Sequence, residues 1–573
     1  IEAMGGKLTV KNSTISNNEA RGNGGGIHSA EGNVLDVSDS TVQGNKGNNG
    51  GGIHTGEARD ASKTPSKATI TNTKVLENEA IGSGEGGGVY VGTRADATLK
   101  GCTVADNKSV STGGGIAAKL GTVTLDDTTV ENNQAVNGGG LFHLGIAVPG
   151  SLTLQNGSII RNNTASSMGG GLFLWGNVGL KSENSEISGN KALYGAGIAA
   201  SQYTANFASP KLELVDTKVN NNGDANTVMG GGIYAASGVT VTSKNTKFLG
   251  NTANTAGGIL LYLNSSADLD NSEVSSNTAT GNGGGVYVYD ATCSLTTSNG
   301  TVFRENSAAN GGGIYSNGGA VTAEDSTFEK NTATANGGGF YLQGTKLTAN
   351  RNTIASNEAK SGGGMYLDST NAELTGNTID GNKVTGSGGG IYAYGDTNNK
   401  GTNTITLKKN TITNNTAGST GGGASFGNKN QKVTLEGDVI EDNSSSAYGG
   451  GIYAGSNCDL TMNGGSISRN NAGKLGGGLS QYGGKSVILN DVTVQGNTAK
   501  SGAGIYVYAN NGKLVLGSGT LVSGNTAQSF GGGIYCASKS IIDLMVGALY
   551  NNHAGTGGDD IHLATKSYAN IFT

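Results

Sequence analysis

Prolines, cysteines and charged residues are scarce in this sequence. Its 573 residues include 3 prolines and 4 cysteines, and 14% of them are charged. Cys102, Cys293, Cys458 and Cys536 lie far apart in the chain, so we find neither a disulfide framework nor a zinc-binding spacing. We interpret them as isolated small hydrophobic residues. No apolar run reaches the roughly 18 residues of a membrane-spanning helix, so the sequence predicts no membrane span.

A strong charge of either sign is also lacking. The formal net charge is −5, the pI is near 5.7, and no basic stripe runs along the chain. Proteins that bind nucleic acid need such a stripe to meet the phosphates, so we expect no nucleic-acid partner. The first residues do not resemble a signal peptide, because residues 8–10 already read as a strand and residues 15–18 as a repeat motif. We expect this to be a piece of a longer protein.

The chain contains a repeat whose first landmark is an apolar residue followed three positions later by asparagine, as in Phe328-Glu-Lys-Asn331. It occurs twenty times, each time at the end of a short β-branched or aromatic segment. Asparagines stacked at one corner of successive coils can donate amide hydrogen bonds to one another. We therefore interpret the column as a structural ladder. Its central members are Asn277, Asn306, Asn331, Asn357 and Asn382.

The second landmark is a run of three glycines, or a near variant, followed by an apolar residue. Nineteen copies run from the one before Ile27 to the one before Ile534, and a degenerate twentieth precedes Ile561. Such glycines suit a corner with positive backbone φ, or a corner where stacking leaves no room for a Cβ atom. Between the landmarks lies a third segment with period-two alternation, such as Leu152-Thr-Leu154.

Together the three segments predict an all-β fold, a single right-handed parallel β-helix with three short strands per coil. Each coil takes about 28 residues, so residues 1–573 form about 20 coils in one continuous domain. Parallel strands joined in one direction of winding are right-handed in nearly all proteins. Leucine-rich repeats are excluded because leucines are few. The calcium-binding nonapeptide roll is excluded because its aspartate column is absent.

The residue after the glycine-led apolar position should face outward, because neighbouring strand residues alternate faces. That column is strongly aromatic, and the residue two positions further on should widen the strip. Such a strip could bind sugar rings or a protein, or it could be a stack that stabilises only itself. The candidate ligand-binding residues are Tyr287, Tyr289, Tyr315, Tyr341, Tyr366, Tyr392 and Tyr394; related positions include Tyr90, Phe142, Phe173, Trp175, Tyr234, Tyr453, Tyr506, Tyr508 and Tyr535.

Four longer segments interrupt the coils at the same corner, near residues 55–67, 145–150, 201–210 and 395–402. They should gather along one edge, which in repeat proteins is often the binding edge. Tolerated surface variation is the alternative interpretation.

Groups that could carry catalysis or hold a metal do not cluster. His28 and His54 replace tyrosine in two adjacent coils, so their rings should lie within about 5 Å of each other, and we interpret them as exposed surface residues. A metal site would need more ligands. The pairs Asp126-Asp127 and Asp559-Asp560 lack an accompanying motif, and we interpret them as solvated surface. Glycoside cleavage needs converging carboxylates, so we expect no enzyme, no cofactor and no metal.

The coupled apolar-x-x-Asn and Gly-Gly-Gly-apolar repeats resemble those of chlamydial polymorphic membrane proteins and of adhesin-like surface proteins with a pectin-lyase-like β-helical passenger. The resemblance runs from Ile15 to Ile561. It implies a secreted, surface-displayed passenger used in adhesion, with no catalytic residues. The chain departs from that family by favouring Ile or Val before the asparagine motif, where the family favours Phe. It also prefers glycine at the third small position, where the family has alanine.

We therefore expect an extracellular, cell-surface adhesin or stalk module that binds a glycan or protein of a host or neighbouring cell. A structural fibre whose copies associate end to end is the second hypothesis, because terminal coils offer unpaired strands. A polysaccharide lyase or hydrolase is the third.

Overall fold

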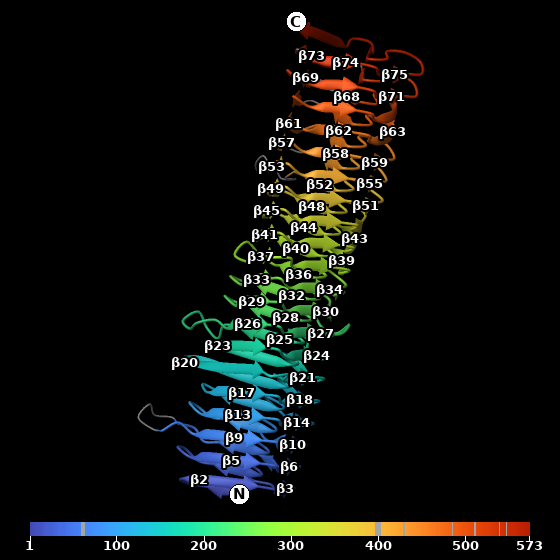
Figure 1. The fold of residues 1–573 in the computed structure, drawn as a ribbon. Coiled ribbons are helices and arrows are strands. Elements are labelled where there is room, and N and C mark those ends of the chain that lie inside the picture. Colours follow the sequence, from blue (N-terminus) through green and yellow to red (C-terminus); the bar gives the residue numbers. More distant parts are fainter. Residues whose placement is uncertain are drawn as a thin grey trace. The chain divides into compact units, whose positions relative to one another are not determined.

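The computed structural model consists of coils of parallel β-strands. It describes residues 1–58, 64–395, 403–427, 430–483, 485–508, 512–537, 539–545 and 547–572. Over these residues it contains no helix, and Figure 1 shows the strands stacked coil upon coil. The fold is the predicted right-handed parallel β-solenoid of about 20 turns. The expected fold class is confirmed.

The chain's contacts group into two compact units. Unit 1 comprises Ile1–Gly281 with Gly285–Leu295, and unit 2 comprises Asn282–Gly284 with Thr296–Thr573. Each unit has its own stack of coils and its own asparagine ladder. The assignment of residues 1–573 to one domain stays a prediction.

One coil of unit 2 illustrates the repeat. It contains strands β42 (Thr327–Glu329), β43 (Thr332–Asn336), β44 (Phe340–Gln343) and β45 (Lys346–Asn350). Three of these are the predicted segments, whereas β43 is a fourth strand that follows the asparagine. Such strands have only two to five residues in the described chain, which is too short for a periodic signal. All pair in parallel with the same strands of the next coil.

The core is formed by columns of inward-facing side chains. Ile314, Phe340, Met365 and Ile391 occupy one such column in successive coils and are fully buried. The residues between them in sequence face the other way, as the pleat of a strand requires. All four cysteines are buried and unpaired, as expected for isolated small hydrophobic residues.

The glycine triplet combines the two predicted reasons for glycine. Gly337 has a φ of 69°, a left-handed value that favours glycine. Gly339 has an ordinary φ, but a Cβ atom there would lie 2.5 Å from the carbonyl oxygen of Gly364 in the next coil. The first glycine therefore turns the chain, and the third lets successive coils approach.

The asparagine ladder is present and buried in both units. The Oδ1 atom of Asn331 accepts hydrogen bonds from the backbone N–H and the Nδ2 of Asn306, at 3.1 and 2.9 Å. Its Nδ2 donates to the Oδ1 of Asn357 and to the carbonyl of Phe303, both at 3.0 Å. The amide therefore makes all four of its hydrogen bonds. The same pattern connects Asn357 to Asn382 in unit 2, and Asn251 to Asn277 in unit 1.

A second ladder, which the sequence analysis missed, lies five positions before the first. The backbone N–H and Nδ2 of Asn352 donate to Asn377, those of Asn377 to Asn410, and those of Asn410 to Asp438. Most other coils have serine or threonine there, four have Cys102, Gly465, Val492 and Gly547, and this variation hid the column.

The inserted segments differ from one another. Residues 145–150 lie inside the long strand β20 (Leu141–Gln155), where the pairing register with β23 (Leu172–Glu183) shifts between Gly145 and Gly150. The segment 201–210 connects β25 (Ile198–Ser201) to β26 (Lys211–Val215). Residues 59–63 of the first insertion and 396–402 of the last lie outside the described residues.

Candidate functional site

Four tyrosines on successive coils of unit 2 form a continuous ring stack. Tyr315 lies on β40 (Ile314–Asn317), Tyr341 on β44, Tyr366 on β48 (Met365–Asp368) and Tyr392 on β52 (Ile391–Tyr394). The ring centroids of Tyr315 and Tyr341 lie 4.9 Å apart, as do those of Tyr341 and Tyr366, and each pair is parallel within 4°. Tyr392 follows at 5.1 Å. We call Tyr315, Tyr341, Tyr366, Tyr392 and Tyr394 the tyrosine strip.

The strip is less exposed than expected. Its tyrosines point away from the core, as the alternation predicts, but each ring covers the next. Tyr315 is only 8% exposed, and Tyr341, Tyr366 and Tyr392 are half-buried. Inside the stack the ring faces contact other rings, so a sugar ring cannot stack on them. Ring edges and hydroxyl groups are the parts left for a ligand.

The carboxylate of Asp368 lies beside the stack. Asp368 ends β48, and its Oδ1 and Oδ2 accept hydrogen bonds from the Ser369 hydroxyl at 2.9 Å and the Gln343 amide at 3.3 Å. Burial raises the pKa of Tyr341 to about 12, with the Tyr315 phenol and the Asp368 carboxylate adding to the rise. The same two causes, burial first and Asp368 among the charges, raise the pKa of Tyr315, Tyr366 and Tyr392. The phenols therefore stay protonated and can donate hydrogen bonds.

The remaining predicted tyrosines divide between the units. Tyr394 packs beside Tyr392 at 6.3 Å in unit 2. Tyr287 and Tyr289 belong to unit 1, where their rings lie 5.2 Å apart, and Tyr262 lies 4.8 Å from Tyr289. Tyr262 was missed, although it occupies the same repeat position as Tyr289. Counting positions from the glycine triplet would have found it.

Unit 1 also has an aromatic cluster in the same column, but it is buried. Tyr90, Phe142 and Phe173 pack with alanines into the core. Trp175 extends the cluster outward and contacts Tyr203 of the 201–210 connection at 4.6 Å.

The two histidines of unit 1 are close but are not both exposed. The rings of His28 and His54 lie 4.9 Å apart, as predicted. However, His54 is only 2% exposed, because it stacks on Tyr90 at 5.0 Å, so its assignment to the surface was wrong. Burial and the neighbouring His28 lower its pKa to about 4. Among the described residues no group of three or more His, Cys, Asp or Glu side chains could hold a metal ion.

Asp559 is exposed and Asp560 is half-buried, so the pair lies at the surface as expected. The Oδ1 of Asp560 also accepts a hydrogen bond from Asn552, the last asparagine of the ladder in unit 2, at 2.8 Å. Asp559 accepts another from the Ala554 backbone. Asp560 therefore also closes the ladder.

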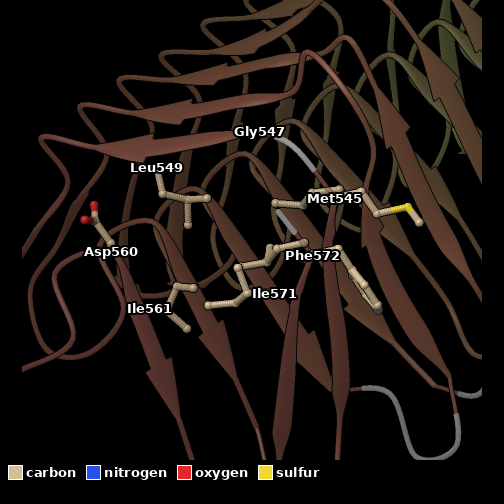
Figure 2. Close-up of a pocket in the computed structure, with 9 residues that line it drawn as sticks. Met545, Gly547, Leu549, Asp560, Ile561, Ile571 and Phe572 are labelled. Carbon is tan, nitrogen blue, oxygen red and sulfur yellow. The ribbon is translucent and has the colours of Figure 1, made fainter.

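The cavity nearest to this pair has a volume of about 440 Å³. Figure 2 shows Leu549, Ile561 and Ile571 converging on it, with the Asp560 carboxylate at its edge. Its lining is mainly apolar and includes the exposed side chains of Met545, Ile571 and Phe572, without converging polar groups. We do not assign a ligand to it.

Comparison with known proteins agrees with this architecture. The family described as the right-handed β-helix region matches residues 63–274, 254–406 and 376–545. The chain belongs to this right-handed β-helix family. A repeat of the Chlamydia polymorphic membrane proteins matches residues 12–30. No curated protein matches the chain.

The two repeat types in this β-helix family member confirm the predicted resemblance. They fit a surface-displayed passenger, and the short polymorphic-membrane-protein match suggests an outer-membrane or surface protein. In the part of the chain that the structure describes, no helix is long and apolar enough to cross a membrane.

Proposed function

We propose that this β-helix is an extracellular adhesin or stalk module that binds a glycan or protein of a host or neighbouring cell. The tyrosine strip forms the contact surface, and the module binds without changing its ligand chemically.

The observation that carries this proposal is the ordered tyrosine stack beside Asp368. Each ring is held by its neighbours, so little side-chain entropy remains to be lost when a ligand binds. The hydroxyls follow one another at the coil spacing of about 4.8 Å. The side-chain amide of Gln343 and the carboxylate of Asp368 lie beside them. Such a row suits a ligand with repeated hydrogen-bonding groups, such as a polysaccharide or an extended peptide.

The test should remove the hydroxyls and keep the stack. Tyr341→Phe with Tyr366→Phe leaves both rings in place, so the fold should persist. We expect attachment of the purified protein to cells to weaken at least tenfold. The matched control is Tyr194→Phe with Tyr234→Phe, a tyrosine pair of unit 1 with ring centroids 5.8 Å apart. Equal attachment by both variants would contradict the proposal.

Two other functions give different results in the same experiments. A polysaccharide lyase or hydrolase would shorten the glycans to which the protein is exposed, and chromatography of the products would detect this. End-to-end fibres would scatter light increasingly with protein concentration whether or not cells were present. Attachment without either signal would support the adhesin.

A further inference from the structure

The tyrosine column of unit 2 is interrupted where β64 (Leu479–Tyr482) presents Ser480 in place of an aromatic residue. The strand pairs on one side with β60 (Ile452–Ala454) and on the other with β68 (Ile505–Tyr508). Ser480 therefore lies between Tyr453 and Tyr506, whose backbones are two coils, or about 9.6 Å, apart.

Five tyrosines surround this interruption. Tyr482 and Tyr508, two positions further along their strands, stack at 5.0 Å. Tyr448 directly precedes a glycine triplet, and its phenol, with that of Tyr482, adds to the rise in pKa of both Tyr453 and Tyr506. Burial is the larger cause and raises both pKa values to about 12. The phenols of Tyr453 and Tyr506 therefore remain protonated and can donate hydrogen bonds.

The Ser480 hydroxyl is the second unusual feature. Its side chain is only 1% exposed, and its Oγ atom has no hydrogen-bond partner within the protein. A buried hydroxyl without a partner costs free energy, and natural proteins keep such groups mainly where a ligand, water or strain explains them.

The aromatic surface above it is open. Tyr482 is 45% exposed and Tyr508 is 36% exposed. The coil before Tyr482 has Gly455 at the corresponding position, so no side chain at that position lies against the Tyr482 ring. Here, unlike in the tyrosine strip, a ring face is available for stacking.

From these features we infer a second binding site, for a neutral oligosaccharide, formed by Tyr448, Tyr453, Ser480, Tyr482, Tyr506 and Tyr508. One sugar ring would stack on the exposed face of Tyr482. Its hydroxyl groups would bond to the phenols and to Ser480.

The charge and size of the cluster favour this ligand over others. No carboxylate or ammonium group is among the neighbours that shift the pKa of Tyr453 or Tyr506, whereas Asp368 affects every stacked tyrosine of the strip. Among the described residues, the two central tyrosines thus have only phenols as electrostatic neighbours, which suits a neutral ligand. A stable protein interface buries about 800 Å² per partner, which is far more than two exposed tyrosine rings offer.

The experiment uses the full chain with soluble neutral hexaoses of β-1,4-glucose, β-1,3-glucose, α-1,4-glucose and β-1,4-N-acetylglucosamine. A polygalacturonate oligomer serves as the acidic probe, and titration calorimetry measures affinity. We expect one of the neutral hexaoses to bind, with little dependence on salt, and the acidic probe not to bind. Tyr482→Ala with Tyr508→Ala should weaken binding at least tenfold. Ser480→Ala, which removes only the unpaired hydroxyl, should weaken it severalfold.

Tyr262→Ala is the control, since Tyr262 occupies the same repeat position in unit 1 and its ring meets that of Tyr289 edge to face at 4.8 Å. It should leave hexaose binding unchanged. Absence of binding to every neutral hexaose would overturn the inference. Equal hexaose affinity of the Tyr482/Tyr508 variant and the parent protein would also overturn it. So would the finding that the parent protein dimerises and that the Tyr482/Tyr508 variant does not.

Discussion

At the scale of single residues, the ladder asparagines are the most heavily bonded side chains of the chain. An inner member such as Asn331 is buried, accepts two hydrogen bonds from the previous coil and donates two, so replacing it leaves groups in several coils without partners. The cost of an unsatisfied buried group exceeds the net gain from one hydrogen bond. The ladder therefore makes the fold specific as well as stable.

Asn331→Ala tests this. The backbone N–H and the Nδ2 of Asn306 lose their acceptor, and the carbonyl of Phe303 loses a donor. At about 1 to 3 kcal/mol for each buried unsatisfied group, we expect a loss of about 3 kcal/mol or more in local stability. Hydrogen exchange of the Asn306 amide measures it. Asn317→Ala, at an exposed position of β40, should change exchange little. Similar protection in the two variants would show that the ladder contributes little.

The buried imidazole of His143 should make the stability of the fold depend on pH. It is fully buried in β20 and pairs in register with Leu174, next to the single tryptophan, Trp175. Burial lowers its pKa to about 4, whereas unfolded histidine titrates near 6.5. Protons therefore bind preferentially to the unfolded state as the pH falls below 6.5. The stability that neutral His143 contributes is present above that pH and is lost towards pH 4.

Unfolding can be followed by the fluorescence of Trp175. For His143 alone, the free energy of unfolding should fall by about 2 kcal/mol between neutral pH and about pH 4.5. His143→Leu should remove that part of the pH dependence, while the part due to His54 remains. An unchanged pH dependence in the variant would mean that His143 already takes up its proton in the folded state.

At the scale of strands and columns, both ladders of unit 2 end in a carboxylate. Asp438 accepts the hydrogen bonds of Asn410, and Asp560 accepts one from Asn552. An ionised carboxylate accepts hydrogen bonds but cannot donate them onward, whereas asparagine does both. Aspartate is thus suited to end a column that asparagine continues.

Prediction from sequence succeeded where one repeat position has one chemical requirement. Every ladder amide must both accept and donate, so asparagine recurs and its column was found, as were the glycine corners and the register of Tyr315 through Tyr392. The second ladder was missed because its corner accepts serine, threonine, cysteine, glycine and valine as well as asparagine. The burial of the tyrosine rings and of His54 was also not predicted. Alternation tells which way a side chain points, but not how much of it the next coil covers.

The stacked tyrosine rings should contribute to the stability of the fold. Tyr366→Ser removes the ring between Tyr341 and Tyr392, and we expect a loss of about 2 kcal/mol, since stacked aromatic pairs contribute roughly 0.5 to 1.5 kcal/mol each beyond burial. Tyr366→Phe keeps the ring and should cost less than about 1 kcal/mol. Denaturation of the two variants compares them. The chain already accepts serine in this column at Ser425 and Ser480, so Tyr366→Ser should fold. Equal stability of both variants would mean that the rings do not stabilise one another.

At the scale of the whole molecule, a coil contacts only the coils before and after it within its unit. The free energy of unfolding is then close to a sum of the contributions of single coils and of the interfaces between adjacent coils. A whole coil should therefore be removable without loss of the fold. The pairing of Phe340 with Met365 defines one full coil, residues 340–364. Its removal would join Gly339 to Met365 and place Tyr366 directly on Tyr315.

We expect the variant lacking residues 340–364 to fold, with an unchanged β-sheet circular dichroism signal per residue and a melting temperature within a few degrees of the parent protein. Asn331 would then donate to Asn382, and the ring stack would shorten to Tyr315, Tyr366 and Tyr392. Removal of residues 353–364 alone is the control, because it brings β48 to the corner where β46 (Thr353–Ala355) belongs and turns Tyr366 out of its column. That variant should lose cooperative unfolding. If it folded as well as the full-coil deletion, the register of the columns would not determine the fold.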